Sequence, residues 1–151
     1  MLKDSIEQLR SIIADYSVKI NNITEDKWSY KPNPSKWSKK EILGHLIDSA
    51  QNNIRRFIVA QYEENPHIVY AQDNWVRMAD YKNYNTNDLI SLWVLLNKHI
   101  CIILANTPEG AEKRVSKTEE LHSIEWLAQD YNRHLLHHLH QVLDLDAVNY
   151  P

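Results

Sequence analysis

Seven apolar residues at the start of the chain repeat with the spacing of one helix face. Successive members lie 4, 3, 4, 3, 4 and 3 positions apart, and an α-helix returns to the same side every three or four residues. This seam predicts an amphipathic helix of about six turns, which must bury its apolar side against other parts of the chain. Its members are Leu2, Ile6, Leu9, Ile13, Tyr16, Ile20 and Ile23.

A second helix is predicted from about residue 39 to residue 62. Ser38 and Glu41 have the spacing of a capping box, in which each side chain bonds the other residue's backbone N–H. Trp37 stands where it could pack on Ile42, one turn inside the helix. The prolines at positions 32 and 34 exclude regular helix just before this start.

Two further helices are predicted after a long crossover. The crossover covers residues 63–85 and could include a short helical turn. Asn85 or Thr86 can cap a third helix that stops near Pro108. Ser123 can cap a fourth helix that runs to about Leu145. Four long helices, with no convincing strand and no internal repeat, predict an all-α four-helix bundle that forms one domain over the whole chain, 1–151.

Composition excludes several other classes of protein. The only cysteine, Cys101, has no partner for an intramolecular disulfide, which favours a reducing compartment. The first ten residues, MLKDSIEQLR, lack the apolar run of a signal peptide or membrane anchor, so we expect a soluble, cytoplasmic protein. A net charge of −3 with scattered lysines and arginines predicts no nucleic-acid partner. The two glycines lie far apart, which excludes a glycine-rich phosphate loop.

Half of the eight histidines lie in one short segment, RHLLHHLHQ, of the fourth helix. At about 100° per residue, His134 and His138 border the apolar face, whereas His137 and His140 fall on the polar side and are predicted to face solvent. Imidazoles one turn apart have Cβ atoms roughly 6 Å apart and can converge on one cation. A helix with partly exposed histidines and no metal is the alternative.

A third histidine lies on a polar stripe of the second helix. His45 lies within about 40° of the other members of this stripe, beside an apolar sector of the same helix. A lone histidine at such a border more often serves structure than metal binding. Gly44 directly before it costs helix stability, and could allow close packing of another helix. The other members of the stripe are Glu41, Ser49, Asn52 and Arg56.

Two segments carry a resemblance to a known family. WSKKEILGHLIDS in the second helix and DYNRHLLHHLHQV in the fourth resemble the DinB/YfiT-like family of metalloenzymes. The resemblance implies a four-helix bundle with up-down-down-up topology, often as a homodimer. It also implies a divalent metal bound by one histidine of the second helix and an H-x-x-x-H pair of the last helix. Carried over to this chain, those ligands are His45, His134 and His138.

The resemblance and the site chemistry together predict function. Three imidazoles with an open metal position are typical of catalytic sites, and the family's implied range covers hydrolases and thiol transferases. We therefore expect a small-molecule substrate, including a low-molecular-weight thiol, and zinc, nickel, iron or manganese as the metal. Asp48 and Asp130 could orient a ligand or act as a base, and Asn52 and Arg56 could bind an anionic substrate group. A non-catalytic bundle with a structural or vestigial metal is the alternative.

A partner chain is a further expectation. Leu136 and Leu143 point away from both the histidine pair and the main apolar stripe of the fourth helix. Such outward leucines could meet a second copy of the chain or cover a loop. The first reading would agree with the homodimers that the resemblance implies.

Overall fold

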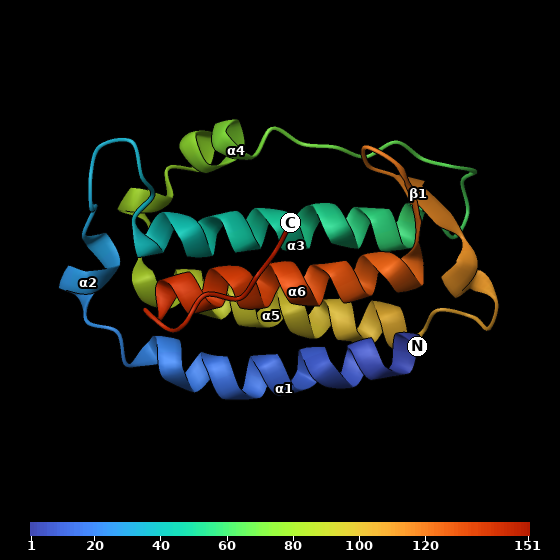
Figure 1. Ribbon diagram of the computed structural model, residues 1–151, viewed down its shortest axis with the longest axis horizontal. Helices are drawn as coiled ribbons and strands as arrows, with labels where there is room; N and C mark the ends of the chain where they lie inside the picture. Colours follow the sequence, from blue (N-terminus) through green and yellow to red (C-terminus); the bar gives the residue numbers. More distant parts are fainter.

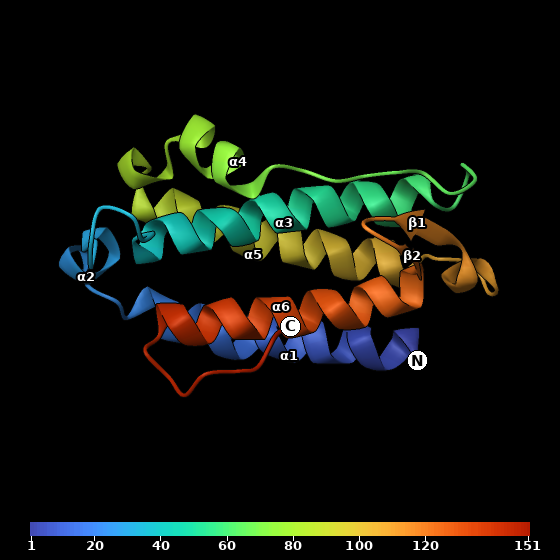
Figure 2. The same ribbon diagram turned by 45° about the horizontal axis from the view of Figure 1, so that its top comes forward.

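The computed structural model describes residues 1–151, and four long helices form most of it (Figures 1 and 2). All four lie side by side with their axes along the length of the molecule. The predicted four-helix bundle is therefore confirmed. The four helices are α1 (Leu2–Asn21), α3 (Lys39–Val59), α5 (Thr86–Ala105) and α6 (Ile124–Val142).

The direction of each helix gives the up-down-down-up topology that was expected. Helices α1 and α6 run one way, and α3 and α5 run the other way (Figure 1). Helix α3 packs against α5 and α6, and α1 packs against the same two helices. Because α3 and α5 are parallel neighbours, the chain between them must travel back along the bundle. This return is the crossover that passes along the outer side of α3.

The connections contain short helices. The turn predicted within the crossover is the helix α4 (Gln72–Ala79), which is followed by a 3-10 turn, η1 (Tyr81–Asn83). A short helix α2 (Glu25–Ser29) lies between α1 and α3, and a second 3-10 turn, η2 (Ala111–Lys113), follows α5. Helix α2 lies at one end of the bundle, whereas α4 lies along the outer side of α3 (Figures 1 and 2).

One small hairpin was not predicted. Strand β1 (Val115–Lys117) pairs antiparallel with β2 (Leu121–Ser123), with Ser116 opposite His122. Three residues per strand are too few for an alternating pattern to stand out from the sequence. The hairpin is nevertheless tied to the crossover, because Lys117 also bridges to His67. The expectation that the chain holds no strand was wrong at this point.

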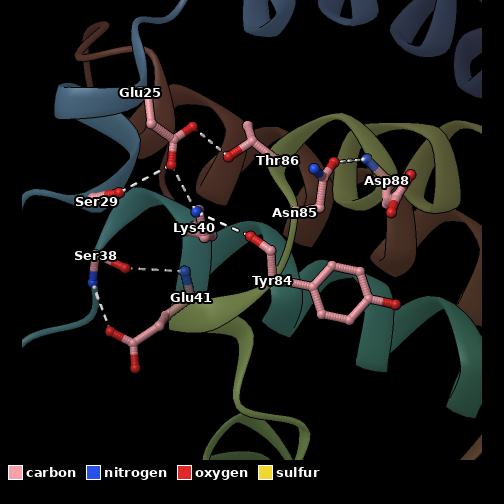
Figure 3. Close-up of polar contacts among 9 residues, drawn as sticks. All are labelled: Glu25, Ser29, Ser38, Lys40, Glu41, Tyr84, Asn85, Thr86 and Asp88. Atoms are coloured by element: carbon pink, nitrogen blue, oxygen red, sulfur yellow. Dashed lines mark hydrogen bonds and ion pairs between the residues drawn. The ribbon is translucent and has the colours of Figure 1, made fainter.

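The predicted helix starts are confirmed in atomic detail. Ser38 Oγ accepts a hydrogen bond from the Glu41 N–H, and the Glu41 side chain accepts one from the Ser38 N–H, which completes the capping box (Figure 3). Asn85 Oδ1 accepts from the Asp88 N–H in the same way at the start of α5. Ser123 Oγ accepts from the backbone of α6.

Helix α6 ends three residues earlier than predicted. Asp144 has a positive φ of 54°, and the Leu145 N–H donates to the His140 carbonyl at 2.9 Å. This pattern is a Schellman turn, which closes a helix by a left-handed residue. Lys39 Nζ also donates to the Val142 carbonyl at 2.6 Å. The end of α6 is thus fixed by one turn residue and by a lysine from α3, which helix periodicity could not reveal.

The core contains the predicted seam and more of α6 than expected. Every residue of the predicted seam is buried in the core or packs against it, although α1 ends at Asn21 and Ile23 lies just beyond it. Leu136 and Leu143 also pack against the core, because α6 lies between α1 and α3 and buries a wide arc of its surface. These two leucines form no free apolar face, so homodimerisation stays a prediction without their support.

Helix α5 is the most apolar of the four. By length and composition alone, Thr86–Ala105 is able to cross a membrane. Several of its side chains, including Trp93 and Ile100, are fully buried in the bundle. Helix α5 packs against α1 and α3, while Leu95 and Ile102 on its outer side are exposed.

A polar group of side chains joins α2, α3 and the start of α5. We call Lys40, Glu25, Thr86 and the Tyr84 carbonyl the Lys40 cluster (Figure 3). Lys40 is 4% exposed, and its Nζ lies 2.8 Å from Glu25 Oε1 and 3.1 Å from the Tyr84 carbonyl oxygen. Thr86 Oγ1 donates to the other Glu25 oxygen. This cluster holds helix α2 and the start of α5 against the start of α3.

Candidate metal centre

The structure brings His45, His134 and His138 together between α3 and α6. One nitrogen from each ring lies within 4.8 Å of the corresponding nitrogens of the other two. His45 Nε2 and His134 Nε2 are 3.1 Å apart. The contact between α3 and α6 explains the meeting, since residues 89 positions apart in sequence face each other across it. We call these three side chains the histidine centre.

The donor geometry fits a divalent cation. Metal–nitrogen bonds to zinc are about 2.0–2.1 Å long, so two imidazole nitrogens at a tetrahedral angle lie about 3.3 Å apart. The 3.1 Å between His45 and His134 is close to this value. The third ring, His138, has its centroid 4.9 Å from His45 and 4.6 Å from His134. Three imidazole nitrogen donors of this kind suit zinc, nickel or iron.

The rings of the centre are neutral at physiological pH. Burial lowers the pKa of His45 to about 4, with a smaller effect of His138. Burial and the neighbouring histidines lower the pKa of His134 to about 2. The pKa of His138 is also lowered, again mainly by burial. Because only the neutral ring offers a lone pair, these shifts keep the three donors available to a metal.

Neighbouring side chains contact two of the three rings. His138 Nδ1 lies 2.8 Å from Gln141 Oε1, so Nδ1 carries the proton and Nε2 keeps its lone pair. The Trp37 ring packs 5.1 Å from the His45 ring. His45 Nδ1 is buried without a partner. Gln141 was not identified from the sequence, although an amide one turn after a histidine on the same face could have indicated it.

His137 and His140 do not face solvent as predicted. Both are partly buried, and their Nδ1 atoms lie within 2.6 and 2.8 Å of the Val148 and Asp146 carbonyl oxygens. His140 Nε2 is also 2.8 Å from the Tyr16 hydroxyl of α1. Helical angles describe α6 alone, whereas the C-terminal segment folds back over this side of the helix (Figure 1).

Asp48 is a buried carboxylate of α3, three residues after His45. It is 1% exposed, and its Oδ1 accepts a 2.6 Å hydrogen bond from the Tyr81 hydroxyl. Burial raises the Asp48 pKa to about 6. Asn52 Nδ2 donates to the Asp48 carbonyl oxygen at 2.9 Å, which ties this amide to the backbone of α3. Neither contact reaches a histidine of the centre.

Tyr81 also explains Gly44. A Cβ at position 44 would lie 2.1 Å from the Tyr81 ring. The close neighbour is therefore the turn η1, not another bundle helix as the sequence had suggested. Because Gly44 has no Cβ, the Tyr81 ring packs directly against α3, and its hydroxyl reaches Asp48 one turn further on.

A cleft of 770 Å³ opens beside His134. Arg56 and Asp130 both line it, as does Tyr150 from the C-terminal segment. The Tyr150 hydroxyl donates to Asp130 Oδ2 at 2.8 Å, and its ring lies 5.2 Å from the His134 ring. The volume is in the range of small-molecule sites. Tyr150 gave no signal in the sequence, since it lies beyond the last helix.

Fold and site together define a class of protein, a four-helix bundle with three histidines arranged to hold one metal. The family pattern of the DinB superfamily matches residues 8–142, and the chain belongs to this superfamily. A protein of Oceanobacillus iheyensis named "putative metal-dependent hydrolase" is 30% identical over 146 residues, which cover 94% of this chain and 82% of that protein. A protein of Bacillus mycoides with the same kind of name is 27% identical over 84 residues, 55% of this chain and 49% of that protein.

Two solved structures share the fold. The structure of YfiT from Bacillus subtilis, described as a probable metal-dependent hydrolase with an unusual four-helix bundle topology, matches with a TM-score of 0.84 and 22% identity. The match covers 95% of this chain and 84% of YfiT. A mycothiol-dependent maleylpyruvate isomerase matches with a TM-score of 0.78 and 16% identity, over 98% of this chain and 62% of the isomerase. At these identities the similarity establishes the fold.

Proposed function

We propose that this chain is a metal-dependent enzyme in which His45, His134 and His138 bind one divalent cation. The observation that carries the proposal is the convergence of three neutral imidazoles within 4.8 Å. A cation bound by three protein ligands keeps an open position and acts as a Lewis acid that makes water or a thiol nucleophilic near neutral pH. The adjacent cleft supplies space for a small-molecule substrate.

Hydrolysis is the first candidate reaction. The names of the relatives in Oceanobacillus iheyensis and Bacillus mycoides both refer to metal-dependent hydrolysis. Asp130 is the better-placed carboxylate for moving a proton, because it lines the cleft together with His134. Asp48 bonds to Tyr81 inside the bundle and is proposed to position α3 instead of contacting substrate. Asn52, tied to the backbone of α3, has the same structural role.

Thiol transfer is the second candidate reaction. It is favoured by the fold shared with the mycothiol-dependent isomerase, which extends over 98% of this chain. In that case a low-molecular-weight thiol would occupy the open metal position and be the second partner. The cytoplasmic location and the homodimer expected from the sequence are compatible with both reactions.

A panel of substrates distinguishes hydrolysis, thiol transfer and the non-catalytic alternative. Zinc-, nickel-, iron- and manganese-loaded protein is offered small esters, amides and lactones with water as the nucleophile, and electrophilic acceptors together with a small thiol. We expect turnover that stops with a chelator and returns when the metal is restored. His134→Ala should abolish the activity, and His137→Ala should retain it. A metal whose removal lowers thermal stability but changes no reaction would support the non-catalytic bundle instead.

A further inference from the structure

Arg56 is a partly buried cation without a carboxylate partner. It lies on α3 and lines the cleft that contains His134. The six ion pairs of the structure do not include it. Burial lowers its pKa, against the opposing effects of Tyr70 and Asp130. Burying a charge is costly unless it is paired. Binding of an anion would therefore offset the cost of burying this guanidinium.

The hydrogen bonds of Arg56 leave one edge of the guanidinium free. Nε and Nη2 both donate to the Ile68 carbonyl oxygen, at 3.1 and 2.9 Å. Nη1 donates to Asn53 Oδ1 at 3.4 Å. A guanidinium has five N–H groups, and these bonds use three of them. One N–H on each terminal nitrogen therefore has no acceptor. The two terminal nitrogens form the edge that binds a carboxylate through two parallel hydrogen bonds.

A structural role alone does not explain the charge. The bond to Ile68 attaches the crossover to α3, and a neutral amide could donate the same hydrogen bond without the cost of a buried charge. The free edge and the cleft are explained together if an anionic group enters from solvent. We propose that the Nη1–Nη2 edge of Arg56 binds a carboxylate group of the small-molecule ligand beside the histidine centre.

The remaining walls of the cleft orient such a ligand. The Tyr70 ring lies 6.0 Å from Arg56 Cζ and restricts the guanidinium on one side. Asp130 carries a negative charge in the same cleft, on the α6 side near His134. The carboxylate is thus attracted to Arg56 on α3 and repelled from α6, which leaves the uncharged part of the ligand near the histidines. That this ligand is the substrate rests on the proposed function, whereas the carboxylate site does not require a metal.

Fluorine NMR titration of the full chain tests the site with two matched probes. The probes are 4-fluorobenzoate and the neutral 4-fluorobenzamide, which have nearly the same shape. Each is added to metal-free and to zinc-loaded protein. We expect 4-fluorobenzoate to bind at least about tenfold more tightly than the amide in both forms, as charge-assisted hydrogen bonds predict.

Four variants localise the binding. Arg56→Gln should weaken 4-fluorobenzoate about tenfold or more, and Arg56→Lys should give an intermediate loss because a lysine keeps the charge but not the forked geometry. Arg55→Gln is the matched control, since Arg55 is the exposed neighbour on the same helix, and it should bind as the parent does. Asp130→Asn removes a negative charge from the cleft and should strengthen binding.

Two results would overturn the carboxylate site. One is equal affinity of the parent for the two probes; the other is a folded Arg56→Gln protein that binds 4-fluorobenzoate like the parent. If Arg56→Gln loses its helical circular dichroism, the carboxylate site is tested by two other measurements. These are the affinity difference between 4-fluorobenzoate and 4-fluorobenzamide in the parent, and the affinity of Asp130→Asn for 4-fluorobenzoate. Zinc titration of the parent is scored separately. Failure to bind zinc would remove the proposed function, while carboxylate binding by the metal-free chain would stand.

Discussion

The Lys40 cluster and the histidine centre are two polar groups that each include a buried residue of helix α3, and they differ in how their atoms are satisfied. In the Lys40 cluster each polar atom meets a partner of opposite character: Nζ faces a carboxylate and a carbonyl oxygen (Figure 3). In the histidine centre one nitrogen from each of three rings converges, only His45 Nε2 and His134 Nε2 lie at hydrogen-bond distance, and His45 Nδ1 has no partner at all.

This difference distinguishes polar groups that stabilise the fold from polar groups that can bind a ligand. A satisfied cluster has no remaining capacity for a ligand, so its value is in fixing the fold. A buried polar atom without a partner is costly, and converging nitrogens with spare lone pairs can be joined by a further group. A cation would join the histidine nitrogens, and an anion would join the free edge of Arg56.

The largest effect is expected at the histidine centre. His45→Ala and His134→Ala should each weaken zinc affinity by more than about 100-fold, because loss of a metal ligand costs more than loss of an outer hydrogen bond. Isothermal titration with zinc measures this. His137→Ala is the control on α6, because its Nδ1 contacts the Val148 carbonyl oxygen and it lies outside the centre. Loss of zinc binding in His137→Ala with retention in His134→Ala would reverse the assignment.

Acid should destabilise the metal-free protein through His45. Its pKa is about 4 when folded and about 6.5 when unfolded, so the unfolded chain binds more protons between these values. The free energy of unfolding therefore decreases as pH falls from 6.5 toward 4, and His45 contributes about 1.4 kcal/mol per pH unit. Above pH 6.5 this contribution to the slope vanishes.

Urea denaturation in the presence of a chelator, at several pH values between about 7.5 and 4.5, measures this slope. His45→Gln cannot take up the proton, so its slope should be smaller by about one proton. Equal slopes for parent and variant would mean that His45 titrates in the folded chain as it does in the unfolded one.

Gly44→Ala tests the packing beneath the centre. The new methyl group would meet the Tyr81 ring, and overpacking of this kind costs about 1–3 kcal/mol of unfolding free energy. Displacement of Tyr81 should also break its hydrogen bond to Asp48. Thermal denaturation gives the loss. Gly110→Ala makes a useful comparison, because that glycine has open space around it but a positive φ of 89°, so any loss there comes from the backbone. Unchanged stability of Gly44→Ala would show that Tyr81 has another position.

The smallest effect is expected in the Lys40 cluster. Lys40→Met keeps the aliphatic stem but removes the bonds to Glu25 and the Tyr84 carbonyl, at a cost of about 1–2 kcal/mol. Zinc affinity should not change, since the cluster contributes no atom to the histidine centre. Chemical denaturation and zinc titration of the same sample check both statements. A Lys40→Met protein that folds normally but loses zinc affinity would remove the distinction between the two regions.

Much of the fold followed from local patterns. The seam of α1 and the caps at Ser38, Asn85 and Ser123 depend on residues within one or two turns of each other, so sequence spacing contains them. The hairpin and the true end of α6 depend on contacts between distant segments. Lys39 closes α6 from the other side of the bundle, and no periodicity carries such information.

The site was predicted unevenly for the same reason. Helical angles placed His134 and His138 on one face, whereas the position of His45 came from a family resemblance. The structure brings all three together. The environment of His137 and His140, and the place of Tyr150 in the cleft, depend on how the C-terminal segment folds back. These contacts arise only after the bundle has assembled.

The most direct test of the account is the metal content of protein purified without a histidine tag or nickel column. Elemental analysis after reconstitution with zinc, followed by removal of loosely bound ions, should find about one equivalent per chain. His45→Ala should hold almost none under the same treatment, although its helical circular dichroism matches the parent. Less than about 0.2 equivalents in the parent, or an equal content in His45→Ala, would contradict the claim that the three histidines form a metal site.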